Sequence, residues 1–333
     1  MPGAAPKIFI TMGDVNGIGP EITLKSIKEV SSDASAVFTI LGSTGVLDFY
    51  QKQLGFEQSI VVGEPNSDPS QVHFIPVDLP SSQSFEPGAV KPDAGEASIR
   101  FIERALELIG SNHDAALVTA PISKQAIWQS GIDFPGQTEL LGSWYGTDRT
   151  VMMMISDKLR VGLATTHFPL REVPDLLTRD LIVKKCLTIC DDLQRRFHIK
   201  TPRLAVAALN PHAGEGGLLG KEEEEMIKPA VNILRDRKVS VDGPMPSDTL
   251  FGPEKLNTYD AFLAMYHDQG MIAVKMVAFG RAVNYTAGLP IVRTSPDHGT
   301  AFDIAGRGIA DASSMVEAIK FAIGVVRQKR RTG

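Results

Sequence analysis

Short apolar segments rich in β-branched residues alternate along this chain with longer segments whose apolar residues recur at helical spacing. In the segment 97–112, for instance, Ile99, Ile102 and Ile109 fall on one helical face. Such alternation predicts an α/β fold in which at least part of the sheet is parallel or mixed. The predicted strands are 7–13, 36–43, 114–122, 151–157, 160–167, 203–210 and 261–267, and the predicted helices are 20–30, 44–55, 97–112, 171–177, 179–197 and 222–237.

A stretch rich in proline and serine, residues 62–93, interrupts this alternation. It has room for one short strand, and the chain shows neither an internal repeat nor a low-complexity linker. We therefore interpret the stretch as an excursion from the fold and not as a boundary between independent domains.

Three histidines, His167, His212 and His267, each end or closely follow an apolar run that the pattern predicts to be a strand. Because the carboxyl ends of strands in open α/β sheets line the ligand crevice, we expect the three imidazoles to lie there. One such histidine alone is more readily explained as a hydrogen-bonded structural residue, but three at the same topological place favour a metal. The remaining histidines, among them His113 in a predicted helix-to-strand loop, lack this pattern as a group.

Three imidazoles leave open positions around a divalent metal, as a catalytic site requires. This ligand set favours Zn²⁺ or Co²⁺, and Mg²⁺ fits if carboxylates and substrate oxygens are added. Asp268 and Asp248 are candidates for further ligands or for partners that orient the imidazoles. On this hypothesis the last predicted strand ends in His267, Asp268, Gln269 and Gly270 because it delivers a ligand and a carboxylate, and the glycine lets the chain turn.

Two glycine-rich segments accompany the strand ends. Residues 13–21, GDVNGIGPE, lie between a predicted strand and a helix that starts at Pro20, which is typical of a tight strand-to-helix turn. The segment lacks the G-x-G-x-x-G dinucleotide fingerprint, so it is either a structural turn or a ligand-contacting loop. The second segment surrounds His212 and precedes four glutamates, 222–225, which we expect to be solvated and to stabilise a helix N-terminus.

Basic and polar side chains near these segments suit an anionic substrate. Lys275 lies beyond His267, Asn284 and Arg293 flank the segment NYTAGLPIVRTS, and Thr138 lies in FPGQTELLG. Each alone is more often a surface or structural residue. Together with a metal, they suggest a small phosphorylated or carboxylated substrate.

Bulk composition narrows the class of protein. The 333 residues, 43% hydrophobic and 22% charged, are enough for two packed domains. The net charge of −5 and the scattered basic residues argue against a nucleic-acid partner. No apolar run approaches the ~18 residues that span a membrane, and the N-terminus does not look like a signal peptide. Cys186 and Cys190, one helical turn apart, are expected to pack in the core of a reduced, cytoplasmic protein.

Several segments carry a family resemblance when they are taken as a set. GDVNGIGPE, TAPISK, GQTE, TTHFPLREVP, LNPHAGEGGLLGKEE, PSDTLF, MYHDQG and NYTAGLPIVRTSPDHGTAFDIAGRG occur in order between Met12 and Ala310. Together they resemble the 4-hydroxythreonine-4-phosphate dehydrogenase family of pyridoxal phosphate biosynthesis. The resemblance implies the two-domain fold of isocitrate and isopropylmalate dehydrogenases, with a mixed sheet and a cleft between the domains. It implies a first domain of residues 1–135 and 290–333, and a second domain of residues 136–289 that carries the metal and dimer contacts.

The same resemblance implies roles for individual residues. One divalent metal per active site would be shared across a homodimer, with His267 from one subunit and His167 and His212 from its partner. The segment HGTAFDIAGRGIA is similar to the loop that holds the adenosine half of NAD in the related dehydrogenases. The implied substrate contacts are Gln137, Thr138, Lys275, Asn284 and Arg293. The implied NAD contacts are His298, Gly299, Thr300, Ala301 and Asp303. Among these, Asp303 would accept a hydrogen bond from the ribose 2′-hydroxyl and would favour NAD over NADP.

The implied reaction is the NAD-dependent oxidation of 4-phosphohydroxy-L-threonine at C3, with decarboxylation to 3-amino-2-oxopropyl phosphate. A metal would lower the pKa of the C3 hydroxyl and polarise the developing carbonyl. Lys275 and Asp268 are both candidates for the base, and the sequence does not choose between them.

One position departs from the family pattern. Gln137 stands where the family usually has a histidine, and an amide donates a hydrogen bond but carries no proton charge. The same chemistry on 4-phospho-D-threonate, 4-phospho-D-erythronate or an aromatic cis-dihydrodiol carboxylate therefore stays open. A phosphotransacetylase-like acyltransferase would need neither the metal nor the adenosine loop. A non-catalytic ligand-binding relative would be expected to lack more of the motif residues.

Overall fold

A computed structural model describes residues 5–31, 36–66, 68–78, 85–110, 114–134, 136–278 and 280–330 of the chain. His113 and its predicted loop lie outside these residues. The chain forms two compact units, one of Met1–Leu140 with Pro290–Gly333 and one of Leu141–Leu289, which we call unit 1 and unit 2. The functional division into two domains, with a cleft between them, stays a prediction.

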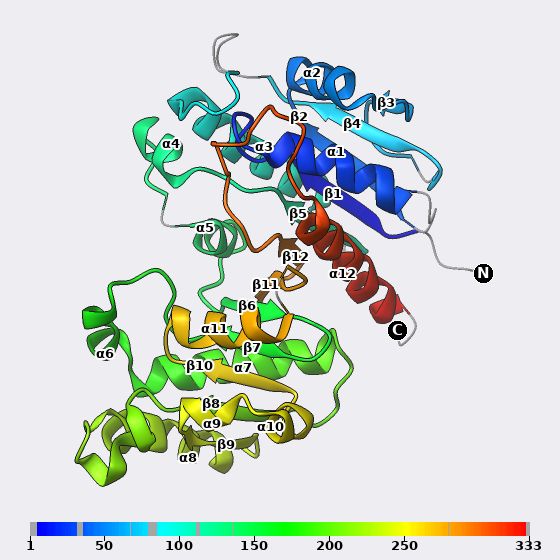
Figure 1. The fold of residues 1–333 in the computed structure, drawn as a ribbon. Coiled ribbons are helices and arrows are strands. Elements are labelled where there is room, and N and C mark those ends of the chain that lie inside the picture. Colours follow the sequence, from blue (N-terminus) through cyan, green and yellow to red (C-terminus); the bar gives the residue numbers. More distant parts are fainter. Residues whose placement is uncertain are drawn as a thin grey trace. The chain divides into compact units, whose positions relative to one another are not determined.

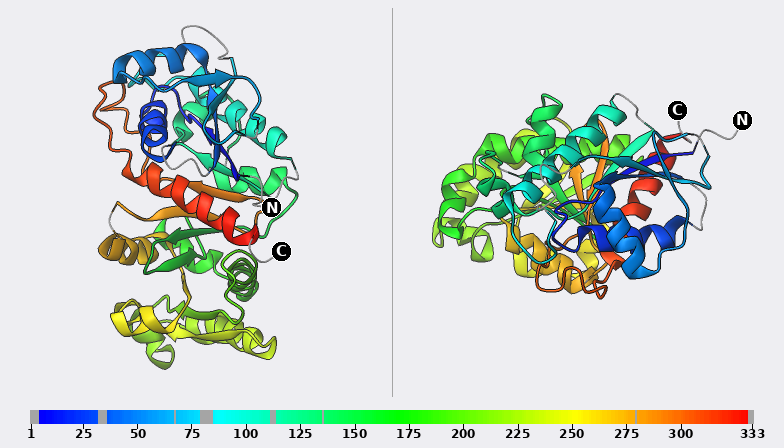
Figure 2. Two further views of the ribbon diagram at one scale, coloured as in Figure 1. Left: turned by 90° about the vertical axis from the view of Figure 1, so that its right-hand side faces the viewer. Right: turned by 90° about the horizontal axis from the view of Figure 1, so that it is seen from above.

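Unit 1 is built on a parallel sheet with the described strand order β3-β4-β2-β1-β5-β12. The inner strands β2 and β5 are buried along their whole length, because helices cover a parallel sheet. Helix α12 packs on β5 and β12 and beside α1, and α3 packs on β1, β2 and β5 (Figures 1 and 2). The elements are β1 Lys7–Thr11, α1 Gly19–Val30, β2 Val37–Gly42, α2 Thr44–Leu54, β3 Ile60–Val62, β4 Val72–Pro76, α3 Pro92–Ile109, β5 Ala115–Thr119, α4 Lys124–Gln129, α5 Gln137–Trp144, whose last residues belong to unit 2, β12 Val292–Ser295 and α12 Ser313–Arg330.

Unit 2 is built on a mixed sheet with the described strand order β11-β6-β7-β10-β8-β9. The pairs β11–β6 and β6–β7 are antiparallel, whereas β7, β10, β8 and β9 run parallel. The predicted α/β class with a mixed sheet is therefore confirmed. The elements are β6 Val151–Ile155, β7 Arg160–Leu163, η3 Leu170–Glu172, α6 Val173–Leu176, α7 Arg179–Arg195, β8 Arg203–Ala207, η4 Pro211–Gly217, η5 Glu223–Ile227, α8 Lys228–Asp236, β9 Ser240–Met245, α9 Ser247–Leu250, α10 Pro253–Thr258, β10 Ala261–Ala264, α11 His267–Ala278 and β11 Val283–Ala287.

Local chemistry explains where several helices begin and end. Pro20 occupies the first turn of α1, where its missing N–H costs nothing. Gly55 closes α2 in the left-handed conformation, with φ 56°, as the sequence predicted. Thr178 caps α7 because its side chain accepts a hydrogen bond from Leu181 N at 3.1 Å.

Within the described residues 62–66, 68–78 and 85–93, the predicted short strand is present as β4, which pairs with β2 and β3 and so belongs to the sheet of unit 1. Cys186 and Cys190 are both free and buried, so their expected packing in the core is confirmed. Among the described helices, none is both long enough and apolar enough to cross a bilayer.

One prediction was wrong, namely that Gly270 lets the chain turn after the strand. Helix α11 already begins at His267, and Gly270 lies inside it. A Cβ atom at Gly270 would come within 2.7 Å of Leu163 Cδ2 in β7. The glycine therefore serves the close approach of α11 to the sheet, and not a turn.

Candidate active site

The three candidate ligand histidines follow three neighbouring strands. β10 lies between β7 and β8 and is parallel to both. His167 follows β7, His212 lies in η4 after β8, and His267 opens α11 after β10. Because the carboxyl ends of parallel neighbours meet at one edge of a sheet, these residues follow strands that end at the same edge. Their role as metal ligands stays a prediction.

Gln269, a buried side chain, ties these strand ends together. Its Oε1 accepts from Met265 N at 2.6 Å, and its Nε2 donates to Ala208 O at 2.7 Å and to Ser247 Oγ at 2.8 Å. Thr165 Oγ1 donates to Met265 O at 2.8 Å and so joins the end of β7 to the end of β10. The amide in the segment HDQG thus fixes the backbone from which His267 projects.

Two of the imidazoles approach each other within one chain. The ring centroids of His167 and His267 are 5.4 Å apart. Two histidines bound to one tetrahedral ion have ring centroids about 5 Å apart, given metal–nitrogen bonds of ~2 Å, so the spacing fits a shared metal. Asp268 Oδ1 lies 2.7 Å from His267 Nδ1, which leaves Nε2 as the nitrogen for a metal.

The third histidine lies in an unusual loop that Glu223 holds. His212, Ala213 and Glu215 all adopt positive φ, which L-residues seldom do. Glu223 Oε1 accepts from Leu209 N at 2.8 Å and from Asn210 N at 2.7 Å. The prediction that all four glutamates are solvated was therefore wrong for Glu223, which is fully buried against this loop.

Among the described residues of this single chain, no group of three or more His, Cys, Asp or Glu side chains surrounds one ion position. One chain brings together the pair His167 and His267.

A buried guanidinium lies among the predicted substrate residues of unit 1. Arg293 on β12 is 2% exposed, and its Nη2 donates to Thr119 Oγ1 and to Gln137 Oε1, both at 2.7 Å. Burial lowers the pKa of Arg293 to about 10, and the charge of Glu139 opposes this shift, so the group is cationic at neutral pH. Its Nη2 thus binds an alcohol and an amide oxygen, both of them uncharged acceptors.

The other predicted substrate residues divide between the units. Thr138 is half-buried in the first turn of α5, next to Gln137 in unit 1. Lys275 in α11 and Asn284 in β11 belong to unit 2, and the buried Asn284 Oδ1 accepts no hydrogen bond within the described residues. Asp268 and Lys275, seven residues apart, are separated by about 10 Å along the helix axis.

The predicted cofactor residues lie between β12 and α12. Asp303 and Gly299 are exposed, whereas His298 is half-buried with Nδ1 3.1 Å from Gly299 O. Thr300 O accepts from Ile18 N at 2.9 Å, and Ala301 has the positive φ of 42°. The GDVNGIGPE turn therefore contacts this loop directly.

Asp14 is the buried carboxylate of that turn. Its Oδ1 accepts from Asn16 N at 3.0 Å, and its buried Oδ2 has no hydrogen-bond partner within the described residues. Burial raises the pKa of Asp14 to about 6, and the hydrogen bond from Asn16 only partly opposes it. Position 13 requires glycine for two reasons. Its φ is 68°, which side chains disfavour, and a Cβ atom there would lie only 2.2 Å from Pro121 O.

Sequence reasoning missed several residues that build the site. Thr119, Gln269 and Glu223 each hold a candidate residue in place, and the pair Glu21 and Lys25 holds the cofactor loop. Four of these residues, Glu21, Thr119, Glu223 and Gln269, lie inside the motifs GDVNGIGPE, TAPISK, LNPHAGEGGLLGKEE and MYHDQG, but a motif does not show what a side chain contacts. Lys25 lies outside these motifs.

Comparison with known proteins places the chain in a family. A sequence model of the family described as pyridoxal phosphate biosynthetic protein PdxA matches residues 33–322. A 4-hydroxythreonine-4-phosphate dehydrogenase of Erythrobacter litoralis is 43% identical, with 95% of each chain covered. The enzyme of that name from Chromobacterium violaceum is 40% identical over 95% of this chain and 96% of its own length.

Solved structures agree. A 4-hydroxythreonine-4-phosphate dehydrogenase from Klebsiella pneumoniae matches with a TM-score of 0.86 and 38% identity, covering 98% of this chain and 99% of that one. A terephthalate 1,2-cis-dihydrodiol dehydrogenase from Burkholderia xenovorans matches with a TM-score of 0.65 and 29% identity, covering 96% and 98%. Isocitrate dehydrogenase from Methylococcus capsulatus, at 15% identity, a TM-score of 0.50 and coverage of 98% and 88%, shares the fold alone. The predicted isocitrate dehydrogenase-like fold is thereby confirmed.

The extent of these matches, over nearly the whole of each chain, establishes both the family and the class of enzyme. The chain belongs to the PdxA family of pyridoxal phosphate biosynthetic proteins and is an oxidoreductase of the dehydrogenase type.

Proposed function

We propose that the chain oxidises 4-phosphohydroxy-L-threonine at C3 with NAD, with decarboxylation to 3-amino-2-oxopropyl phosphate, in cytoplasmic pyridoxal 5′-phosphate biosynthesis. The observation that carries this proposal is the near-full-length similarity to curated 4-hydroxythreonine-4-phosphate dehydrogenases. The proposal is also supported by the buried Arg293, by the spacing of His167 and His267, by exposed apolar side chains of unit 2 and by the segment from His298 to Asp303.

Arg293 supports an anionic substrate. A cation that is almost fully buried, with hydrogen bonds to an alcohol and an amide, gains most from a charged acceptor such as a phosphate or carboxylate oxygen. Gln137 holds one face of the guanidinium, and Thr138 next to it supplies a hydroxyl. Lys275 and Asn284 complete the proposed substrate contacts.

His167, His212 and His267 are the proposed ligands of one divalent metal, with Zn²⁺ favoured over Co²⁺ and Mg²⁺. When bound, such a metal polarises the C3 hydroxyl and the carbonyl that forms from it. The 5.4 Å spacing of His167 and His267 supports the assignment. Asp268 holds the His267 ring by its Nδ1, so Lys275 is the better candidate for the base that takes the hydroxyl proton.

Exposed apolar side chains near these histidines support a homodimer formed through unit 2. Among the described residues, Met276 is 82% exposed, Leu218 78%, Ile272 65% and Leu170 64%. Exposed apolar groups gathered near a site commonly mark a protein interface. We propose that the metal site is completed by residues of both subunits.

The segment from His298 to Asp303 is the proposed NAD contact. NAD, when bound, supplies the acceptor for the hydride of C3. The exposed Asp303 carboxylate would accept from a ribose 2′-hydroxyl and would repel the 2′-phosphate of NADP. His298, Gly299, Thr300 and Ala301 would contact the adenosine half through their backbone and the imidazole.

A second candidate keeps the chemistry and changes the substrate. Gln137 replaces the histidine usual in this family, and the terephthalate cis-dihydrodiol dehydrogenase shares the fold at 29% identity. An aromatic cis-dihydrodiol carboxylate would use Arg293 for its carboxylate and would need no phosphate contact. Phospho-D-threonate and phospho-D-erythronate would use the same cation for their phosphate.

The deciding experiment follows NADH formation by purified protein on the four substrates, each with EDTA and with EDTA followed by excess Zn²⁺. We expect metal-dependent turnover on 4-phosphohydroxy-L-threonine, with at least a tenfold preference in kcat/KM over the others, because one well-placed ionic hydrogen bond is worth about that factor. Preference for another substrate would assign the second candidate, and Gln137→His would then be expected to move the preference back. No NADH with any substrate would contradict both.

A further inference from the structure

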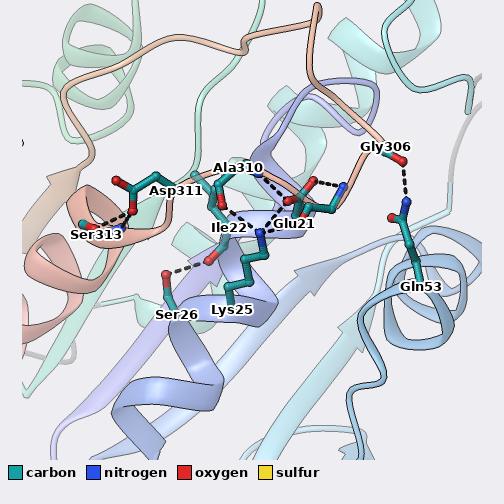
Figure 3. A network of polar contacts seen from close by, with 10 residues as sticks. Glu21, Ile22, Lys25, Ser26, Gln53, Gly306, Ala310, Asp311 and Ser313 are labelled. Carbon is teal, nitrogen blue, oxygen red and sulfur yellow. Dashed lines mark hydrogen bonds and ion pairs between the residues drawn. The ribbon is translucent and has the colours of Figure 1, made fainter.

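The long segment between β12 and α12, residues 296–312, contains neither helix nor strand, yet its backbone is tied to unit 1 along its length. Segments of this length without regular structure are usually functional in a compact domain. Near its start, Thr300 O accepts from Ile18 N at 2.9 Å. Further along, Gly306 O accepts from Gln53 Nε2 of α2 (Figure 3).

The strongest attachment is an ion pair of α1, Glu21 with Lys25. Lys25 Nζ donates to Glu21 Oε1 at 2.7 Å, to Gly308 O at 2.9 Å and to Ala310 O at 2.8 Å, so every ammonium proton has an acceptor. Glu21 Oε1 also accepts from Ala310 N at 2.7 Å, and Oε2 accepts from Gly308 N at 3.2 Å. Figure 3 shows both charged groups turned towards the loop.

This pair determines the position of the loop backbone more than it adds to stability. Glu21 is fully buried and the Lys25 side chain is 28% exposed, and an ion pair this deeply buried contributes little net free energy. The pair instead fixes the position of the loop backbone, because side chains from one helical turn bind both the N–H and the C=O groups of Gly308 and Ala310. Asp303, in the same segment, is exposed.

We propose that Glu21 and Lys25 are positioning residues that hold the segment 298–305 in the conformation that binds the adenosine half of NAD. The inference rests on the proposed function, since the ligand of the loop is taken from there. Neither side chain contacts the cofactor. Both act through the backbone of residues 308–310, which continues the binding segment.

The test compares Lys25→Met with the wild-type chain by calorimetry, using NAD and ADP-ribose as probes. Loss of the Lys25 contacts should weaken ADP-ribose binding about tenfold or more, because the ligand must then order the loop backbone itself. The KM for NAD should rise in parallel, and the KM for the phosphorylated substrate at saturating NAD should change far less. Lys25→Arg should restore part of the affinity, and Lys28→Met, at an exposed position of the same helix, should match the wild type.

A second variant guards against simple misfolding. Lys25→Met leaves the Glu21 charge buried and unpaired, whereas the double variant Glu21→Gln with Lys25→Met leaves no such charge. The double variant should fold and still bind ADP-ribose weakly. If the wild type binds ADP-ribose and both variants bind it equally well, the positioning role is overturned and the proposed function stands. Equal losses for ADP-ribose and the phosphorylated substrate would also overturn it. A wild type that binds neither NAD nor ADP-ribose would overturn the proposed cofactor itself.

Discussion

Some ionisable side chains of this protein are buried, and Asp14 is a clear case. It lies fully buried in the turn between β1 and α1, where one carboxylate oxygen has a backbone donor and the other has no partner among the described residues. Burial raises its pKa from 3.8 to about 6. Arg293 is the cationic counterpart, since its guanidinium is also buried and its Nη2 donates to Thr119 and Gln137. Both groups lie close to proposed ligand-binding segments.

Asp14 should make the stability of the protein depend on pH. The pKa is higher in the folded chain, about 6, than its usual value of 3.8, so between these values the folded state binds more protons than the unfolded state. Stability therefore falls as the pH rises from about 4 to about 6, by at most about 3 kcal/mol. Asp14→Asn, which keeps an acceptor for Asn16 N, should remove this loss. Urea unfolding of both proteins at several pH values checks it, and parallel curves would contradict the assignment.

At the scale of elements, the candidate histidines follow the ends of strands, and buried amide and carboxylate side chains hold the loops that contain them. Gln269 joins the ends of β10 and β8, and Thr165 joins β7 to β10. Glu223, in the π-type turn η5, does the same for the loop that carries His212. The strained backbone of that loop persists because the buried carboxylate holds two of its amides.

Glu223→Ala should weaken metal binding without removing any ligand. Without the carboxylate, Leu209 N and Asn210 N lose their acceptor, and His212 is no longer held in its left-handed conformation. Loss of such a supporting contact typically costs about 10-fold to 100-fold in metal affinity. A competition titration of Zn²⁺ against a chelator measures it. The matched control is Glu225→Ala, at an exposed position of the same turn, and equal affinities for the two variants would refute the role of Glu223.

At the scale of the whole molecule, the arrangement of the metal site between subunits is open to direct test. The family resemblance implies that His267 comes from one subunit and His167 and His212 from the other. Within one chain, however, His167 and His267 have ring centroids 5.4 Å apart, and the described residues of one chain contain no group of three ligands. A dimer of mixed subunits tests whether each proposed site takes its ligands from both chains or from one.

Each of His212→Ala and His267→Ala should abolish metal-dependent turnover while circular dichroism shows an unchanged fold. Co-expression of the two variants should restore about a quarter of the wild-type activity if the site is shared as the family implies, because half of the dimers are mixed and each contains one intact site. Size-exclusion chromatography confirms that the mixed dimers form. If mixed dimers form and stay inactive, the ligands of each site come from a single chain.

The quoted motifs located much of the candidate site in advance. Arg293 and Gln137 were named from the family resemblance, and the structure joins them by a hydrogen bond. Thr119, which holds Arg293 from a neighbouring strand, could not be predicted, because its contact links residues far apart in the chain. Gly270 was misjudged for a related reason. A glycine in a turn and a glycine beneath a packed helix look alike until the neighbouring Leu163 is placed.

Local sequence was sufficient for the alternating strands and helices, the left-handed cap at Gly55 and the family itself, since periodicity, capping and motif order are properties of nearby residues. The order of the strands was not available in this way. That β7, β10 and β8 are neighbours, and that His167 and His267 face each other in consequence, depends on hydrogen bonding between segments distant along the chain. The same holds for the Glu21–Lys25 attachment of residues 308–310, because only the folded chain brings α1 to that loop. Which charges are buried, and so which pKa values shift, was likewise decided by packing, because desolvation depends on all the atoms that surround a group.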